Sequence, residues 1–237
     1  TPKQGNAHGG THEGIHERIH ADILKEGLLE KDARLGSALV DMYAKCGDVV
    51  KARAVFDTEV LVRNVVSWTA LITGYCQHGH GEEALNCFEQ MQKEGYPPNS
   101  VTFACVLKAC GSIRALNKGI QVHADVIREG LLQTDVLLST ALVDMYAKCG
   151  DLAKAQEIFD DLQYRDVVAW NVLISGYAQN GHGEQALHCF RHMRQDNIFP
   201  NVVTFVCTLK ACGILGASDE GQEIHSAIIR GGFLRGN

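Results

Sequence analysis

The stretch ALVDMYAKCGD at residues 38–48 recurs letter for letter at residues 141–151 of this 237-residue chain. The same spacing extends outward, because Trp68 has a counterpart in Trp170 and VTFACVLKAC at 101–110 has one in VTFVCTLKAC at 203–212. A long internal period is typical of a repeat protein, in which each unit buries its apolar face against its neighbours. The chain therefore uses a unit of roughly a hundred residues about twice.

The composition limits the classes of partner. The formal net charge is −6 with 21% charged residues, so no overall positive charge attracts nucleic acid or anionic membranes. No apolar run approaches the roughly 18 residues of a membrane span, so no membrane contact is expected. The opening residues TPKQGNAHGGTH lack a Met and an apolar segment, which predicts a piece cut from a longer chain.

The cysteines predict a reducing environment. None of the nine has C-x-x-C spacing, and several lie within apolar helical patterns: Cys87, Cys105, Cys189 and Cys207. Cysteine often packs as a small apolar side chain, so we expect reduced, buried thiols and no disulfide framework. Such thiols suit the cytosol or an organelle matrix.

Apolar residues recur at helical spacing from Ile15 onward. Leu39, Met42 and Tyr43 predict one helix, residues 46–48 a turn, and Val55 with Phe56 a second helix. Each such helix has about three turns and is too short to be stable alone, so it must pack on its neighbours. We therefore predict an all-α fold, a right-handed superhelical solenoid of helix-turn-helix repeats with a concave inner face. The β-branched strings VVSW and VVAW pass into helical spacing and predict no strands.

The unit lengths are distinctive, with 35 residues at 65–99, 36 at 100–135 and 31 at 136–166, followed by 35 and 36 again. With the strings VVSWTALITGYCQHGHGEEALNCFEQMQKEGYPPN, LVDMYAKCGD and VTFACVLKACGS, the chain closely resembles the pentatricopeptide repeat family over about residues 14–237. The rotation of lengths is similar to the plant subclass that alternates P, L and S motifs. Residues 1–13 are rich in Gly and His and aperiodic, which predicts a disordered segment. The resemblance implies these motifs for the rest: 14–32 partial L, 33–64 S, 65–99 P, 100–135 L, 136–166 S, 167–201 P and 202–237 L.

The resemblance implies sequence-specific binding of single-stranded RNA, one base per repeat, through the fifth and the last residue of each motif. An ionised Asp only accepts hydrogen bonds, so it suits G or U, whose ring N–H is a donor. Asn can donate its amide and suits A or C. In the fifth position a small hydroxyl leaves room for a purine, whereas Asn favours a pyrimidine.

Carried over motif by motif, the pairs predict a target. Ser37 with Asn64 reads A, Thr69 with Asn99 reads A, Thr140 with Asp166 reads G, and Asn171 with Asn201 reads C over U. The L motifs pair Ala104 with Asp135 and Val206 with Asn237, and apolar fifth residues discriminate poorly. The predicted core is 5′-AANGCN-3′, parallel to the protein.

Two further contacts follow from the resemblance. The second residue of each motif would wedge between bases, and the matching residues are Val66, Val101, Leu137, Val168 and Val203, with Arg34 as the exception. Position thirteen would contact phosphate, through Lys45 and Lys148 in the S motifs, whereas the P motifs carry Gln77 and Gln179. With the negative net charge, this implies weak, salt-sensitive binding by so short an array.

Simpler roles compete with these. Thr and Asn at helix starts commonly cap helices, the two lysines fit a solvated face, and Trp68, Trp170, Tyr43 and Tyr146 fit the apolar core. The H-x-E strings at 80–82 and 182–184 resemble half of a deaminase zinc site, but no P-C-x-x-C accompanies them, so they are interpreted as turns. His188 and His192 could form a zinc face, yet their counterparts Asn86 and Gln90 cannot, which favours surface histidines.

The chain has no P-loop, G-x-S-x-G or dinucleotide fingerprint, so we expect neither an enzyme nor a cofactor. The resemblance implies a site-recognition factor for RNA processing in plastid or mitochondrion, above all C-to-U editing. A deaminase domain in cis or in trans, and organelle editing cofactor proteins, would be the partners.

The alternative is a tetratricopeptide-like protein-binding scaffold, whose pattern fits Trp68, Leu71, Tyr75, Ala84 and Phe88. A nuclease or stability factor is a third class, but no carboxylate cluster supports it.

Overall fold

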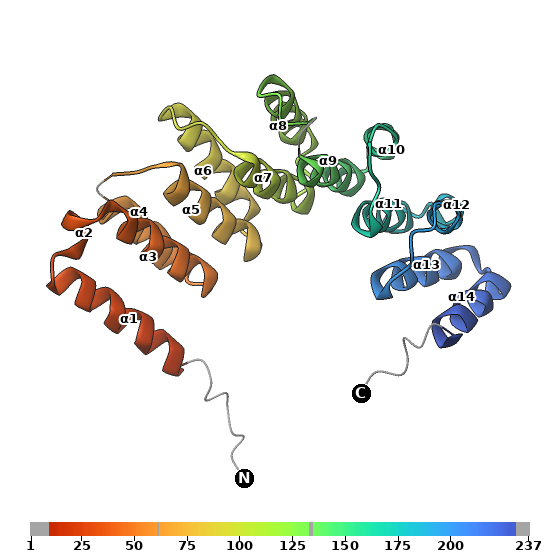
Figure 1. Ribbon diagram of the computed structural model, residues 1–237, viewed down its shortest axis with the longest axis horizontal. Coiled ribbons are helices and arrows are strands. Elements are labelled where there is room, and N and C mark those ends of the chain that lie inside the picture. The colour runs from red at the N-terminus through yellow and green to blue at the C-terminus, as the bar shows by residue number, and fades with distance from the viewer. Residues whose placement is uncertain (1–9, 61, 133–134, 231–237) are drawn as a thin grey trace, which may run out of the picture. The chain divides into compact units, whose positions relative to one another are not determined.

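The computed structural model describes residues 10–60, 62–132 and 135–230, and every regular element in them is an α-helix (Figure 1). The chain divides into two compact units, residues 1–109 and 110–237, which are described separately below. The predicted all-α array of helix-turn-helix repeats is confirmed. The helices are α1 Gly10–Lys25, α2 Leu28–Lys31, α3 Ala33–Lys45, α4 Val49–Thr58, α5 Val65–Gln77, α6 Gly81–Lys93, α7 Ser100–Ser112, α8 Leu116–Arg128, α9 Val136–Cys149, α10 Leu152–Asp160, α11 Val167–Gln179, α12 Gly183–Gln195, α13 Val202–Leu215 and α14 Ser218–Arg230.

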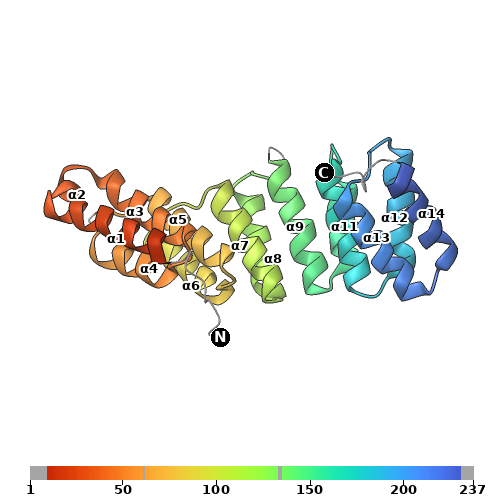
Figure 2. The same cartoon turned by 90° about the horizontal axis from the view of Figure 1, so that it is seen from below.

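In the first unit, α3 with α4 and α5 with α6 form hairpins, and α3 packs directly against α5 (Figure 2). Trp68 of α5 is fully buried, with its ring centroid 4.5 Å from that of Phe56 of α4. Phe88 and Phe103 lie 5.9 Å apart by the same measure. The apolar stripe of each short helix is thus buried by the next repeat, as the spacing of the stripe predicts.

The second unit repeats this packing with its own residues. Here α9 with α10 and α11 with α12 form hairpins, and α11 contacts both α9 and α13. Phe159 and Trp170 lie 4.7 Å apart by ring centroids, which matches the Phe56–Trp68 pair. Tyr43 and Tyr146 are each 3% exposed, so the prediction that the tryptophans and these tyrosines belong to the core is confirmed.

Two glycines set the closest approach of the first helices of successive repeats. A Cβ built on Gly74 of α5 would lie 2.4 Å from the Cβ of Ala44, and one on Gly176 of α11 would lie 2.6 Å from that of Ala147. Real Cβ atoms do not come so close, so only glycine fits there. The following loops bond to the same alanines: His78 Nε2 lies 2.9 Å from the Ala44 carbonyl oxygen, and Asn180 Nδ2 donates to that of Ala147 at 2.9 Å.

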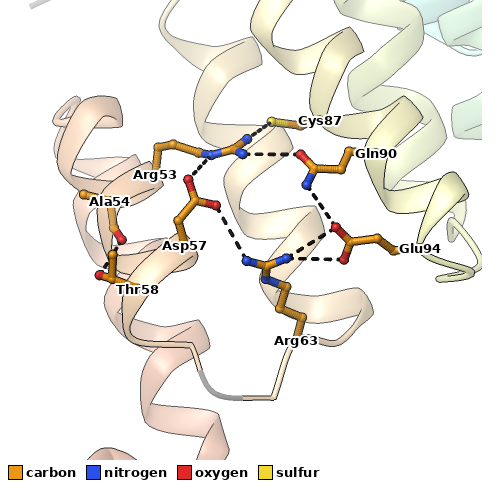
Figure 3. A network of polar contacts seen from close by, with 8 residues as sticks. All are labelled: Arg53, Ala54, Asp57, Thr58, Arg63, Cys87, Gln90 and Glu94. Atoms are coloured by element: carbon orange, nitrogen blue, oxygen red, sulfur yellow. Dashed lines mark hydrogen bonds and ion pairs between the residues drawn. The ribbon is translucent and has the colours of Figure 1, made fainter.

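The second helices of the repeats are joined differently in the two units. In the first, the Arg53 guanidinium of α4 donates to Asp57 at 2.7 Å, to Cys87 Sγ at 3.2 Å and to Gln90 Oε1 at 3.3 Å, and Arg63 donates to Glu94 (Figure 3). In the second, Gln156 occupies the place of Arg53, and a cleft of about 300 Å³ lies between α10 and α12. The cleft lining includes His188 and His192, whose Nε2 atoms are 3.1 Å apart.

The helices are short, and in the part of the chain that is described none is both long and apolar enough to cross a membrane. Helix α1 begins at Gly10, five residues before the apolar pattern at Ile15. Residues 1–9 of the segment predicted to be disordered lie outside the described residues.

Candidate nucleic-acid interface

The predicted base-reading Asn residues begin helices. The Oδ1 atom of Asn64 accepts a hydrogen bond from Ser67 N at 2.9 Å, that of Asn99 from Thr102 N at 2.9 Å, and that of Asn201 from Thr204 N at 3.1 Å. A backbone N–H can bond only the oxygen of an amide, so the cap fixes which end of each side chain faces the helix. The Nδ2 groups of these three residues have no hydrogen-bond partner among the described residues and remain available as donors.

The Asp residues cap helices in the same way, but their second side-chain atom is a hydrogen-bond acceptor and not a donor. Asp166 Oδ1 accepts from Val168 N at 3.0 Å and from Ala169 N at 2.9 Å, and Asp135 Oδ1 accepts from Leu137 N at 3.0 Å. An ionised carboxylate has no hydrogen to donate, so the second oxygen of each side chain can only accept. The capping role and the base-reading role thus use different atoms of one side chain and do not exclude each other.

The structure brings the fifth and last residues of the second P motif into direct contact. Asn171 Nδ2 donates to Asn201 Oδ1 at 3.1 Å, although the two residues are far apart in sequence. The Thr204 hydroxyl, which belongs to the next motif, donates to Asn171 Oδ1 at 2.6 Å. Both amide oxygens are therefore engaged, and the remaining donors are the Nδ2 group of Asn201 and the second hydrogen of Asn171 Nδ2.

The first P motif holds the corresponding residues through hydroxyl groups. Thr69 Oγ1 lies 2.8 Å from Thr102 Oγ1, which lies 2.9 Å from Asn99 Oδ1. Thr69 also donates to the Val65 carbonyl at 2.7 Å. Thr102 and Thr204 thus link a fifth residue to a last residue in both copies, and sequence reasoning missed them. Their signal was present in the sequence, since Asn-x-x-Thr at 99–102 and 201–204 follows the spacing of a capping box.

The S and L motifs hold their fifth residues differently. Thr140 is half-buried and donates to the Val136 carbonyl at 3.0 Å. Ser37 is only 6% exposed, and its Oγ has no partner among the residues that the structure covers. Ala104 is half-buried and Val206 is exposed, and neither side chain can form a hydrogen bond. Asn237 lies outside the described residues.

The predicted wedge residues form a set of exposed aliphatic side chains next to the caps. Their exposed fractions run from 50% for Val101 to 65% for Val66, and the other members are Leu137, Val168 and Val203. Arg34, the exception in sequence, is bound to the preceding cap, because its Nε and Nη2 both donate to Asp32. These hydrogen bonds lower the pKa of Asp32 to about 2. Flat apolar faces such as those of bases would cover the exposed aliphatic groups.

The two predicted phosphate-contacting lysines are paired within their own helices. Lys45 Nζ lies 2.6 Å from Asp41, and Lys148 Nζ lies 2.7 Å from Asp144. Such i,i+4 pairs contribute only about 0.3–0.5 kcal/mol, so a phosphate can compete for the ammonium group. Lys108 and Lys210 are two further candidates for a phosphate contact that the motif pattern does not name. They lie one turn after Ala104 and Val206, are exposed, and have no ion pair with described residues.

The residues of the rival scaffold pattern lie inside the repeats. Trp68, Leu71, Tyr75, Ala84 and Phe88 are all buried, with Tyr75 the most exposed at 8%. They therefore stabilise the hairpin and offer no surface to a bound peptide. Among the described residues, no group of three or more His, Cys, Asp or Glu side chains is placed to hold a metal ion.

Comparison with known proteins agrees with this arrangement. The profile of the PPR repeat family matches residues 63–112 and 165–213, and that of the PPR repeat matches residues 37–58 and 139–167, so the matches cover more than half of the chain. In structure the chain is similar to pentatricopeptide repeat protein PPR10 from maize, with a TM-score of 0.71 at 20% identity over 93% of this chain and 33% of that one.

Several curated relatives come from Arabidopsis thaliana. Pentatricopeptide repeat-containing protein At4g30700 is 42% identical over 85% of this chain and 25% of its own length. The chloroplastic protein At4g18520 is 39% identical over 82% and 31%, and the mitochondrial protein At2g03380 is 41% identical over 90% and 30%. The chain thus spans about a third or less of the length of these relatives.

Proposed function

Because this chain belongs to the pentatricopeptide repeat family, we propose that it binds single-stranded RNA and reads bases with the free atoms of its helix-capping Asn and Asp side chains. The observation that carries the proposal is the orientation of these caps. Asn64, Asn99 and Asn201 each keep Oδ1 on the helix and leave Nδ2 as a donor, whereas Asp166 leaves an acceptor.

Base chemistry then assigns the letters. The pairing edges of A and C present a ring nitrogen that accepts a hydrogen bond, so they suit the amide donors. G and U present a ring N–H and suit Asp166. In the second P motif, Asn171 fills space beside Asn201 and favours the smaller C, whereas Thr69 leaves room for A beside Asn99. The proposed core is 5′-AANGCN-3′, in which the two positions of the L motifs are unspecified.

The arrangement of the two remaining contact sets supports the same proposal. The exposed aliphatic residues beside the caps would separate successive bases, and Lys45 and Lys148 would exchange their aspartate partners for phosphates. Neutralising a few phosphates gives an affinity that falls with salt. With a net charge of −6, the chain has no broad positive surface to offset that loss.

We assign the chain to the subclass that alternates P, L and S motifs, and to site recognition in organelle RNA processing, above all C-to-U editing. The support is the rotation of 35, 36 and 31 residues at 65–99, 100–135 and 136–166. On this proposal the chain itself supplies recognition and no catalysis, and a deaminase domain in cis or in trans supplies the chemistry. Relatives named chloroplastic and mitochondrial support an organelle as the location, with editing cofactor proteins as further partners.

The test is binding of a labelled single-stranded RNA that contains AANGCN, measured by fluorescence anisotropy at low and moderate salt. We expect tighter binding than to the same RNA with G and C exchanged. Asp166→Asn should shift the preference at the G position to A, because the amide donates where the carboxylate accepted.

The matched control is Asp135→Asn, which makes the same chemical change at a cap whose fifth residue is the apolar Ala104. It should leave the preference at the G position unchanged. Equal affinity for both RNAs, with the helical circular dichroism signal intact, would contradict the proposal and favour the protein-binding scaffold.

A further inference from the structure

Two cysteines of the first unit meet between consecutive repeats. Cys76 lies near the end of α5, and its Sγ is 3.0 Å from the carbonyl oxygen of Cys105 in α7. The Thr73 hydroxyl, one turn before Cys76, lies 3.3 Å from Cys105 Sγ. Both thiols are half-buried, so a small molecule can reach them from solvent.

The surroundings of Cys105 favour its thiolate. A hydrogen bond from the Cys76 side chain, a second from Thr73 and the positive charge of Lys108 lower the pKa of the Cys105 thiol to about 6, against the opposing effect of burial. Thiolates and not thiols attack disulfides, so a lowered pKa makes Cys105 the more reactive sulfur of the two at neutral pH, with Cys76 close by as a second thiol.

We propose that Cys76 and Cys105 form a reactive dithiol, a site that low-molecular-weight disulfides oxidise to an intrachain disulfide. The Cys105 thiolate attacks one sulfur of the small disulfide, breaks its S–S bond and releases one thiolate, which leaves a mixed disulfide on Cys105. The Cys76 thiol then loses its proton to solvent, its sulfur attacks Cys105 Sγ, and the second small thiolate leaves. The protein dithiol loses two electrons, and the small disulfide is reduced to two thiols.

The chain contains a contrasting pair of similar placement. In the second unit, Cys149 Sγ of α9 lies 3.8 Å from the carbonyl oxygen of Cys110. Burial, together with the nearby Cys149, raises the pKa of the Cys110 thiol to about 12. Burial also raises the pKa of the Cys149 thiol. At pH 7 both thiols of this pair are therefore thiolate to a much smaller extent than Cys105, which outweighs the weaker nucleophilicity of a less basic thiolate.

The repeat supplies a second contrast at the equivalent place. Cys207 of α13 corresponds to Cys105, but Ala178 stands where Cys76 would be. Cys207 is buried and has no neighbouring thiol at that position. The second copy therefore has one half of the site and cannot close a disulfide there. The proposal does not depend on RNA binding, since it concerns thiol chemistry alone.

The experiment treats the 237-residue chain with oxidised glutathione at pH 7, blocks free thiols with N-ethylmaleimide at successive times, and maps the peptides by mass spectrometry. We expect a peptide that joins Cys76 to Cys105 as the first crosslink, well before any link between Cys110 and Cys149. The exposed Cys46 should carry only a glutathione adduct and serves as the reference for an accessible thiol.

Two variants separate the steps. Cys76→Ser keeps a hydroxyl donor beside Cys105, so the reaction should stop at a glutathione adduct on Cys105. In Cys105→Ser no crosslink to Cys76 should form. The rate of iodoacetamide alkylation of Cys105 should rise with pH around a midpoint near 6.

A midpoint near 9, or a Cys110–Cys149 link that forms as fast, would overturn the proposal. The proposal would also be overturned if glutathione treatment of Cys76→Ser removed as many free thiols as in the wild-type chain but left no adduct on Cys105. Circular dichroism of each variant shows whether the helices are retained, and a glutathione adduct on Cys46 at the wild-type rate shows that accessible thiols still react.

Discussion

The two P motifs, at residues 65–99 and 167–201, share a scaffold and differ at one residue of their candidate sites. Both carry a buried Trp as their fourth residue, and both end on an Asn whose oxygen caps the next helix. The fifth residue is Thr69 in the first copy and Asn171 in the second. Thr69 stops at the hydroxyl of Thr102, whereas Asn171 reaches the capping Asn201 itself.

The comparison shows that the cap is held constant while the space beside it changes. Asn99 and Asn201 both leave an amide donor, so on the proposed function both sites would select A or C over G or U by hydrogen bonding. On the same proposal, the choice between purine and pyrimidine would depend on how much of that space the fifth side chain occupies. The fifth residue would then select bases by size, and the last residue would select them by hydrogen bonding.

The largest effect is expected where both copies pack on the preceding repeat. Gly74→Ala would place a Cβ 2.4 Å from the Cβ of Ala44, and Gly176→Ala would place one 2.6 Å from that of Ala147. Overpacking of this kind costs about 2 kcal/mol in the free energy of unfolding, even though Ala favours helix. Urea unfolding followed by circular dichroism measures it. Gly213→Ala, where the Cβ would enter open space, is the control and should be neutral or stabilising by up to about 1 kcal/mol.

Exchange of the fifth residues should exchange the preferences of the two sites. Asn171→Thr opens the space beside Asn201, so binding at the C position should turn in favour of A by about tenfold, or about 1.4 kcal/mol. Thr69→Asn should do the reverse at its own site. Competition binding with RNAs that differ at one base measures both. If Asn171→Thr lowers the affinity for all four bases equally, size selection by the fifth residue is wrong.

Removal of the bridging hydroxyls should change base preference less than exchange of the fifth residues does, and more in the second P motif than in the first. Thr204→Val leaves Asn171 Oδ1 without its 2.6 Å donor, so the amide can turn and the preference for C should fall about fivefold. Thr102→Val should have less effect, because Thr69 keeps its bond to the Val65 carbonyl. Thr204→Ser should restore the preference. Identical losses in the two Val variants would show that the bridge does not orient Asn171.

The smallest effect is expected outside the two P motifs, at the lysines of the S motifs. Lys148→Ala should reduce the slope of log affinity against log salt by about 0.7 and leave base preference unchanged. Lys45→Ala should have the same effect, since each lysine is paired with an aspartate four residues before it. Affinity titrations at four salt concentrations measure the slope. A change in base preference would instead place these lysines at the bases.

The fold could be predicted because its determinants are periodic. The stripe of Trp68, Leu71 and Ile72 repeats as Trp170, Leu173 and Ile174, and every one of these side chains is buried. Burial of a stripe depends on spacing along one helix, which the sequence contains directly. The contact of Gly74 with Ala44 follows less directly, because it depends on how closely two helices approach.

The candidate site could be predicted only as a set of positions. The Asn and Asp caps follow from local sequence, since a cap and its helix are neighbours. The bonds from Thr204 to Asn171 and from Arg34 to Asp32 were missed for different reasons. The first joins two motifs and depends on the three-dimensional register of their helices. The second is local, but the family pattern expects an apolar residue at position two and therefore does not predict an ion pair there. The burial of Ser37 depends on packing that no single-helix pattern describes.

If helix caps read bases as proposed, their capping role limits how such an array can be retargeted. Only side chains that reach back to the first backbone N–H groups can occupy the position, and replacement by Ala costs about 1 kcal/mol per helix. The usable alphabet is therefore short. Asn and Asp are nearly equivalent within it as caps but opposite as hydrogen-bonding partners, since they differ by one amide group in place of one oxygen. An engineer can thus rewrite the letter read at Asn64, Asn201 or Asp166 while the helix that follows still starts at the same residue.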